Sequence, residues 1–269
     1  MLPEVNYIFL LIASGITAGI LAGLFGVGGG LVIVPALFFI LQNMGVAPEV
    51  AIAMAVNTSL VSIIPTALSS ARAHHKLNNV DWMIVYRWAP PMIVGVLLGA
   101  AMVAKVRTPW LIMFFGCLLL LVALNKLLRP RSFSGSTQMP KYPWQALVAS
   151  LIGWASATAG VGGGATGVPA LTAMGVSIHR AVGTCAALGL CIALPGSLLM
   201  FTLSATPPGA LVGTFHLVYL PALFFLAPAT VLCAPMGAWL GKKLSPRLLS
   251  LSFALLLIVV GGKMVSTAF

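Results

Sequence analysis

Two glycine-rich runs are the residues of this sequence most suited to holding a ligand. The first run contains Gly26, Gly28, Gly29 and Gly30, and the second contains Gly160, Gly162, Gly163 and Gly164. Glycine lets a ligand approach the backbone, and a helix that begins after such a run offers free N–H groups and the positive end of its dipole. We therefore predict an anion site at the two runs. The alternative is that the glycines only permit close helix packing.

Small polar residues follow each run on the next apolar segment, at Asn57 and Thr58 in the first half and at Thr184 in the second. Their hydroxyl and amide groups could bond to substrate oxygens, or could instead join neighbouring helices. His179 and Arg180 begin the segment that carries Thr184, and arginine suits planar recognition of an oxyanion. A role in a cytoplasmic loop explains this pair equally well. We predict that all five residues contribute to substrate binding.

Other polar residues have simpler interpretations. The stretch 72–76 (Arg-Ala-His-His-Lys) is interpreted as a solvated loop, with an anion-attracting vestibule as the alternative, and His216 as an interfacial residue at the start of a helix. The carboxylates Glu4, Glu49 and Asp81 lie near the ends of apolar segments. The sequence therefore lacks an acidic relay in mid-membrane. It also lacks a metal-ligand cluster and a nucleophile elbow, so we predict no catalytic residues, no metal and no cofactor.

Composition indicates the surroundings of these residues. Of 269 residues, 60% are hydrophobic and only 6% are charged, and the mean hydropathy is +1.10. Soluble domains are about a quarter charged, so the solvent is a lipid bilayer and the fold is predicted to be all-α and polytopic. The net charge of +11 comes from basic residues scattered between apolar segments. They are interpreted as topogenic, and no nucleic-acid partner is predicted.

The apolar segments repeat in order. The predicted segments are 5–25, 31–42, 48–70, 81–104, 109–128, 144–160, 166–175, 179–203, 214–240 and 246–266. The pieces at 31–42 and 166–175 are too short to cross a membrane at full thickness. We predict two homologous transmembrane halves, 1–128 and 144–269, joined by a cytoplasmic linker at 129–143, with about eight to ten membrane segments.

The distribution of charge favours an inverted relation between the halves. An inverted arrangement leaves eleven of the 14 basic residues on one side, whereas a parallel arrangement divides them eight to six. The loop 71–80 contains Arg72 and Lys76, but its counterpart at 204–213 contains no charge. Opposite polarity in equivalent loops is expected of inverted repeats, in which glycine-broken helices line the substrate site.

At these residues the chain resembles the TauE/SafE sulfite exporter family, also called the toluene sulfonate uptake permease family. The resemblance rests on the stretch 22–30 with Pro35, on 160–164 with Pro169, and on the stretch 179–184 (His-Arg-Ala-Val-Gly-Thr). The stretch 234–238 (Ala-Pro-Met-Gly-Ala) adds a later match. In the first half the chain departs from the family pattern, because Pro48-Glu49 stands where the family has a basic pair.

The resemblance implies a multi-pass carrier of the bacterial inner membrane for sulfite, sulfonates or sulfoacetate, with a homodimer as a candidate assembly. Alternating access of one repeat against the other is the expected mechanism. The alternatives are an anion channel or a cation carrier built on the same broken helices, and a non-transporting membrane assembly partner. The choice among anions, the direction of transport and the coupling ion are not specified by the sequence.

Overall fold

The fold was obtained as a computed structural model that describes residues 5–103, 139–206, 208 and 210–268, together with seven positions between 113 and 124. Most of the predicted helix 109–128 and most of the predicted linker 129–143 therefore lie outside the described residues. The first half contains α1 (Val5–Phe25), α2 (Gly30–Asn43), α3 (Pro48–Lys76) and α4 (Trp82–Val103). The second half contains α6 (Tyr142–Ala159), α7 (Gly164–Ala173), α8 (Ile178–Leu203), β1 (Thr214–Phe215), β2 (Val218–Tyr219), α9 (Leu220–Lys243) and α10 (Pro246–Ala268).

The chain is an all-α polytopic membrane protein, as predicted. Within the described part, α1, α3, α4, α8 and α9 are long and apolar enough to cross a bilayer. Large apolar side chains such as Phe9, Leu98 and Phe224 are more than half exposed on the outside of the bundle. A soluble protein does not expose such a surface, so these side chains face lipid.

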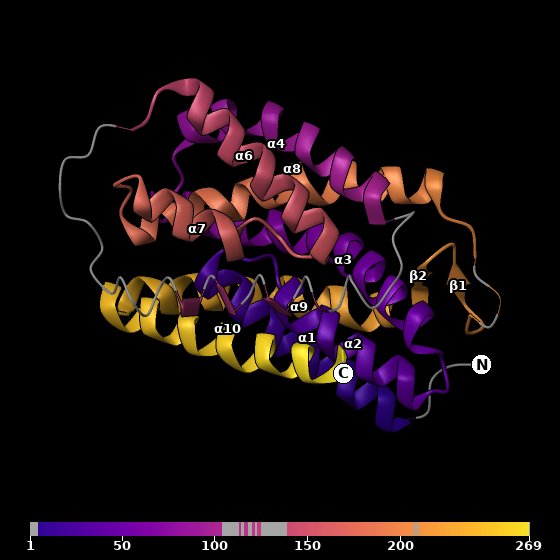
Figure 1. Cartoon of the computed structure of the whole chain (residues 1–269). Coiled ribbons are helices and arrows are strands. Elements are labelled where there is room, and N and C mark those ends of the chain that lie inside the picture. The colour runs from indigo at the N-terminus through magenta and orange to yellow at the C-terminus, as the bar shows by residue number, and fades with distance from the viewer. Residues whose placement is uncertain are drawn as a thin grey trace.

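The two long helices α3 and α8 form the centre of the bundle (Figure 1). They run antiparallel, because Leu60 packs near Gly196 whereas Ala67 packs near Gly189. The pair α1–α9 covers α3, and the pair α4–α6 covers α8. Each covering pair packs closely through glycine, as small residues allow in membranes.

Both glycine-broken hairpins contain a helix that does not span the membrane. In the first, the Tyr7 hydroxyl donates to the Asn43 carbonyl over 3.2 Å, so the end of α2 lies beside the start of α1. In the second, α7 has only 10 residues, which is about 15 Å at ~1.5 Å per residue. Because the hydrocarbon core is about 30 Å thick, such a helix cannot cross it.

The prediction of one helix over 214–240 is wrong at its start. Residues 214–219 form a two-stranded antiparallel hairpin in which Thr214 pairs with Tyr219 and Phe215 with Val218. His216 begins the two-residue turn with a positive φ of 54°, a conformation that ends helical continuity. Aromatic and β-branched residues favour the strands. Pro221 then lies in the first turn of α9, where its missing N–H costs nothing.

Candidate functional site

Both glycine runs interrupt the helices, as predicted. Gly26, Gly28 and Gly29 adopt positive φ angles of 66°, 70° and 84° between α1 and α2. Gly160 caps α6 in the left-handed conformation, with φ of 66°. Residues other than glycine rarely adopt these angles, so the sequence requires glycine at the points where the helices stop.

The two runs lie against one another in antiparallel fashion, and we call this contact the glycine crossing. Gly28 lies opposite Gly162, since a Cβ built on Gly28 would be 3.5 Å from the Gly162 Cα. A Cβ on Gly30 would be only 2.5 Å from the Gly160 oxygen, and one on Gly164 would be 2.7 Å from the Val27 nitrogen. Backbone therefore meets backbone here, and a side chain would force the two hairpins apart.

Each run also packs on the long helix of the opposite half. Gly26 meets α8 near Ala186, and Gly160 meets α3 at Val56. The Ser59 hydroxyl on α3 donates to the Gly160 carbonyl over 2.8 Å. This bond satisfies a carbonyl that the break in α6 leaves without an intrahelical partner.

The helices α2 and α7 begin at the glycine crossing. Their first N–H groups have no carbonyl four residues earlier in the same helix, and their dipoles put partial positive charge there. In this conformation apolar side chains cover the crossing: Ile63 lies against Gly28, and Ile192 against Gly163. An anion would reach these N–H groups only after the hairpins or these side chains move.

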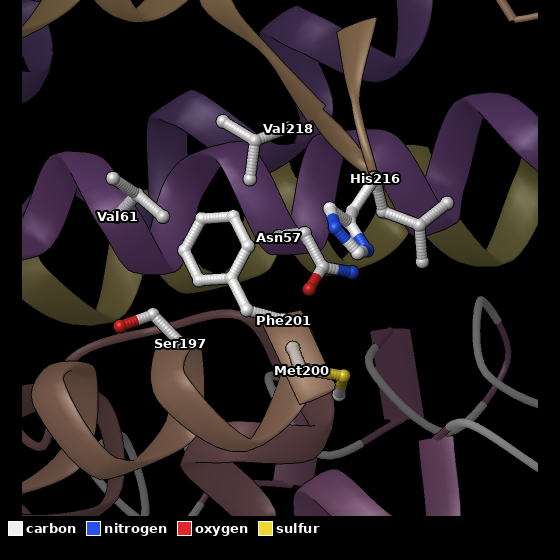
Figure 2. Close-up of a pocket in the computed structure, with 8 residues that line it drawn as sticks. Asn57, Val61, Ser197, Met200, Phe201, His216 and Val218 are labelled. Carbon is white, nitrogen blue, oxygen red and sulfur yellow. The ribbon is translucent and has the colours of Figure 1, made fainter. Parts of the chain in front are cut away.

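A narrow pocket, here called the Asn57 pocket, lies at one end of the α3–α8 pair. Its lining residues are Asn57, Val61, Ser197, Met200, Phe201, His216, Leu217 and Val218. Asn57 donates through Nδ2 to the Ala53 carbonyl over 2.8 Å. Its amide points toward the space between Phe201, Met200 and His216 (Figure 2). The amide oxygen is thus available to a molecule in the pocket.

A second pocket, here called the His74 pocket, lies at the other end of the same helices. It is lined by Leu24, His74, Asn79, His179, Val182, Gly241 and Lys242. On α3, His74 is seventeen residues beyond Asn57, or about 25 Å at ~1.5 Å per residue. Ile63, which packs on Gly28, lies between them on α3. The glycine crossing therefore separates two pockets that are almost a membrane thickness apart.

The prediction that the stretch 72–76 is a solvated loop is wrong for His74. The structure instead continues α3 to Lys76 and leaves His74 only 2% exposed. His74 Nε2 lies 2.7 Å from the Gly23 carbonyl in the last turn of α1. A histidine in an apolar helix end could have been recognised from helical spacing, because His74 follows Ser70 and Ala67 at intervals that keep it on the buried face.

Thr58 and Thr184 lie on α3 and α8, the corresponding long helices of the two halves, about one helical turn apart in register. The Thr58 hydroxyl accepts a bond from the Tyr219 amide over 3.0 Å. The Thr184 hydroxyl accepts one from the Asp81 amide over the same distance. Both hydroxyls therefore hold the residue just before a neighbouring helix, which supports the interhelical alternative for them.

Arg180 lies at the surface rather than in either pocket. Its Nη2 donates to Asp81 Oδ2 over 2.8 Å, and the arginine side chain is 56% exposed. An exposed ion pair contributes little stability. Together with the bond from the Asp81 amide to Thr184, however, the Arg180–Asp81 ion pair holds the start of α4 against the start of α8.

Replacement of Thr184 by valine should destabilise the protein more than it impairs binding. The change leaves the Asp81 amide without its acceptor, which costs about 1–3 kcal/mol. Thermal unfolding in detergent should register this loss, and Thr202→Val, whose hydroxyl bonds only within its own exposed helix turn, should behave as wild type. Unchanged stability with abolished transport would instead assign Thr184 to the substrate.

One end of the molecule is basic. Every Lys and Arg whose side chain the structure describes lies at the His74-pocket end, in the last turns of α3 and α9 or near the first turns of α4, α6, α8 and α10. These residues are Arg72, Lys76, Arg87, Lys141, Arg180, Lys242, Lys243 and Arg247. We call this the basic end.

Two broken helices that meet inside a bundle of lipid-facing helices are typical of membrane transporters. The chain belongs to the family described as sulfite exporter TauE/SafE, whose match covers residues 11–264. This agrees with the resemblance found in the glycine runs.

Individual relatives agree with this membership. A probable membrane transporter protein of Haemophilus influenzae is 34% identical, with 96% of this chain and 98% of the relative covered. A probable membrane transporter protein of Bacillus subtilis, YunE, is 27% identical over 95% of this chain and 96% of its own length. One from Methanocaldococcus jannaschii is 26% identical over 94% and 93%. No solved structure gives a significant match.

Proposed function

We propose that this protein is a secondary transporter that moves a small sulfur-containing anion, of the sulfite, sulfonate or sulfoacetate class, across a bacterial inner membrane by alternating access. The observation that carries the proposal is the position of the glycine crossing between the Asn57 pocket and the His74 pocket. A substrate at such a crossing would be released to whichever side has its pocket open. The protein acts as a carrier and performs no chemistry on its substrate.

Inverted repeats account for the contacts at the crossing. If the halves are inverted repeats, a two-fold axis in the membrane plane exchanges the two glycine runs. The residues of one run then contact the residues of the other in reverse order along the chain. The contacts of Gly30 with Gly160 and of Gly28 with Gly162 follow that order. Thr58 on α3 bonds to the residue before α9, and Thr184 on α8 bonds to the residue before α4, so the two bonds join corresponding pairs of helices and support the same symmetry. Rocking of one repeat against the other then opens the pockets in turn.

The charge of the site supports an anionic substrate. The N-terminal ends of α2 and α7 meet at the crossing, and their dipoles favour negative charge. In the described part of the chain, no Asp or Glu lines either pocket, whereas His74, His179 and Lys242 line one of them. By the positive-inside rule the basic end is cytoplasmic, so the His74 pocket opens to the cytoplasm and the Asn57 pocket to the opposite side.

Counterflow in proteoliposomes tests this function. Liposomes loaded with unlabelled sulfite, thiosulfate, sulfoacetate, taurine or sulfate are diluted into the same labelled compound, with protein-free liposomes as the control. A carrier should accumulate label transiently and with saturation for at least one anion of this panel. A flux that does not saturate would identify a channel, and cation flux without anion flux would refute the anionic substrate.

A further inference from the structure

The His74 pocket contains two histidine nitrogens that no described contact explains. His74 is almost fully buried, yet its Nδ1 has no hydrogen-bond partner in the described part of the chain. The Nε2 of His179 is also buried and without a partner there. Both rings line the same pocket. Buried polar atoms are nearly always bonded, so two unpartnered nitrogens on residues that line the same pocket indicate a ligand that is absent from this conformation.

The partner of Nε2 defines what Nδ1 of His74 can do. The Gly23 carbonyl can only accept, so Nε2 carries a hydrogen and donates it. When the ring is neutral, Nδ1 therefore carries a lone pair and can only accept a hydrogen bond. When the ring is protonated, Nδ1 becomes a second donor on a residue that lines the pocket, and the complementary partner is then an anion.

The surrounding charges favour the anion. Lys242 from the last turn of α9 and Asn79 from the loop before α4 complete the polar lining. Asp81, the acid at the start of α4, is already paired with Arg180 outside the pocket. On α3 itself, His75 and Lys76 are exposed.

We propose that the His74 pocket is a proton-linked subsite for a small oxyanion at the basic end of the protein. The anion binds between His74, His179 and Lys242, and one proton moves from bulk solvent onto His74 Nδ1 as it binds. This inference deepens the proposed transport function and rests on it for the class of ligand. The inference assigns the coupling of transport to a proton carried by histidine, since the sequence has no carboxylate in mid-membrane.

The same histidine links the subsite to the glycine crossing. His74 holds the Gly23 carbonyl, three residues before Gly26, where the backbone of α1 breaks. Leu24, the residue after Gly23, lines the pocket. An anion that draws His74 toward Lys242 therefore pulls on the last turn of the broken helix.

Calorimetry on the purified full-length protein in detergent tests the subsite without requiring transport. Sulfate and thiosulfate serve as probes, because both stay fully ionised from pH 6 to pH 8. Titration in two buffers of different ionisation enthalpy counts the protons taken up. We expect about one proton per anion, and therefore binding about a hundredfold tighter at pH 6 than at pH 8, about tenfold for each pH unit. Failure of the wild-type protein to bind either probe would overturn the subsite, even if counterflow of another anion succeeds.

Matched substitutions locate the proton and the charge. His74→Gln keeps a donor for the Gly23 carbonyl but cannot be protonated, so proton uptake and pH dependence should be lost. Lys242→Met should weaken binding about tenfold. The controls are His75→Gln and Lys243→Met, since His75 bonds to Trp82 and Lys243 lies over the Trp239 ring. Proton uptake that persists in His74→Gln, or equal losses in the controls, would refute the proposal.

Discussion

The alanine variant of Gly164 is expected to lose transport by at least about a hundredfold and to unfold at a lower temperature. Its new Cβ would lie 2.5 Å from the Gly26 carbonyl carbon and 2.7 Å from the Val27 nitrogen. Both are backbone atoms of the opposite hairpin and cannot rotate away. Overpacking of a core by a methylene costs about 1–3 kcal/mol, and at the crossing it also shifts both helix ends that form the predicted site. Counterflow and thermal unfolding measure the two effects.

The same glycine-to-alanine substitution at two other positions serves as a control. Gly163, in the same run, has an ordinary φ of −60°, and the atom nearest to its built Cβ would be the end of the flexible Ile192 side chain, at 3.0 Å, with the next atom at 3.9 Å. Gly262 has no atom within 4 Å of a built Cβ. Gly163→Ala should therefore be mild and Gly262→Ala neutral. Equal loss in the variants of Gly163 and Gly164 would mean that the crossing is not packed as described.

Much of the fold could be predicted because hydrophobic length and glycine placement act locally. The start and end of α1, the breaks after Phe25 and Ala159, and the short α2 and α7 follow from where apolar residues stop and glycines begin. The hairpin at 214–219 was missed because an apolar stretch of that length suits either a strand or a helix. Its identity depends on the backbone at His216 and on packing against α3.

The candidate site was predictable in its glycines but not in its partners. Nothing in the sequence shows that Gly28 meets Gly162, since that contact joins two hairpins that are remote along the chain. The burial of His74 depends on the Gly23 carbonyl, which becomes available only because α1 ends there. Thr58 and Thr184 were placed correctly on the inner helices, but the amides they bond to belong to other segments. Tertiary contacts thus decide between the binding and the packing interpretations.

Asn57→Asp is the second substitution from which we expect a large effect, and it separates an anion carrier from a cation carrier. Asn57 is buried, and its amide faces the pocket between Phe201 and His216 (Figure 2). Aspartate has the same shape but carries negative charge. At an effective dielectric constant of about 20, two unit charges about 4 Å apart repel by about 4 kcal/mol. Uptake of a small anion at pH 7.5 should therefore fall at least about a hundredfold.

Asn57→Leu distinguishes charge from the loss of the amide. Leucine removes both polar atoms without adding charge, so an anion carrier should rank wild type above the leucine variant and the leucine variant above the aspartate variant. A cation carrier should reverse the last two, because a carboxylate attracts its substrate. The ranking is measured by counterflow at matched protein content, with thermal unfolding to verify that both variants are folded. Anion uptake by Asn57→Asp at the wild-type rate would show that the substrate does not pass this amide, and would remove the Asn57 pocket from the transport path.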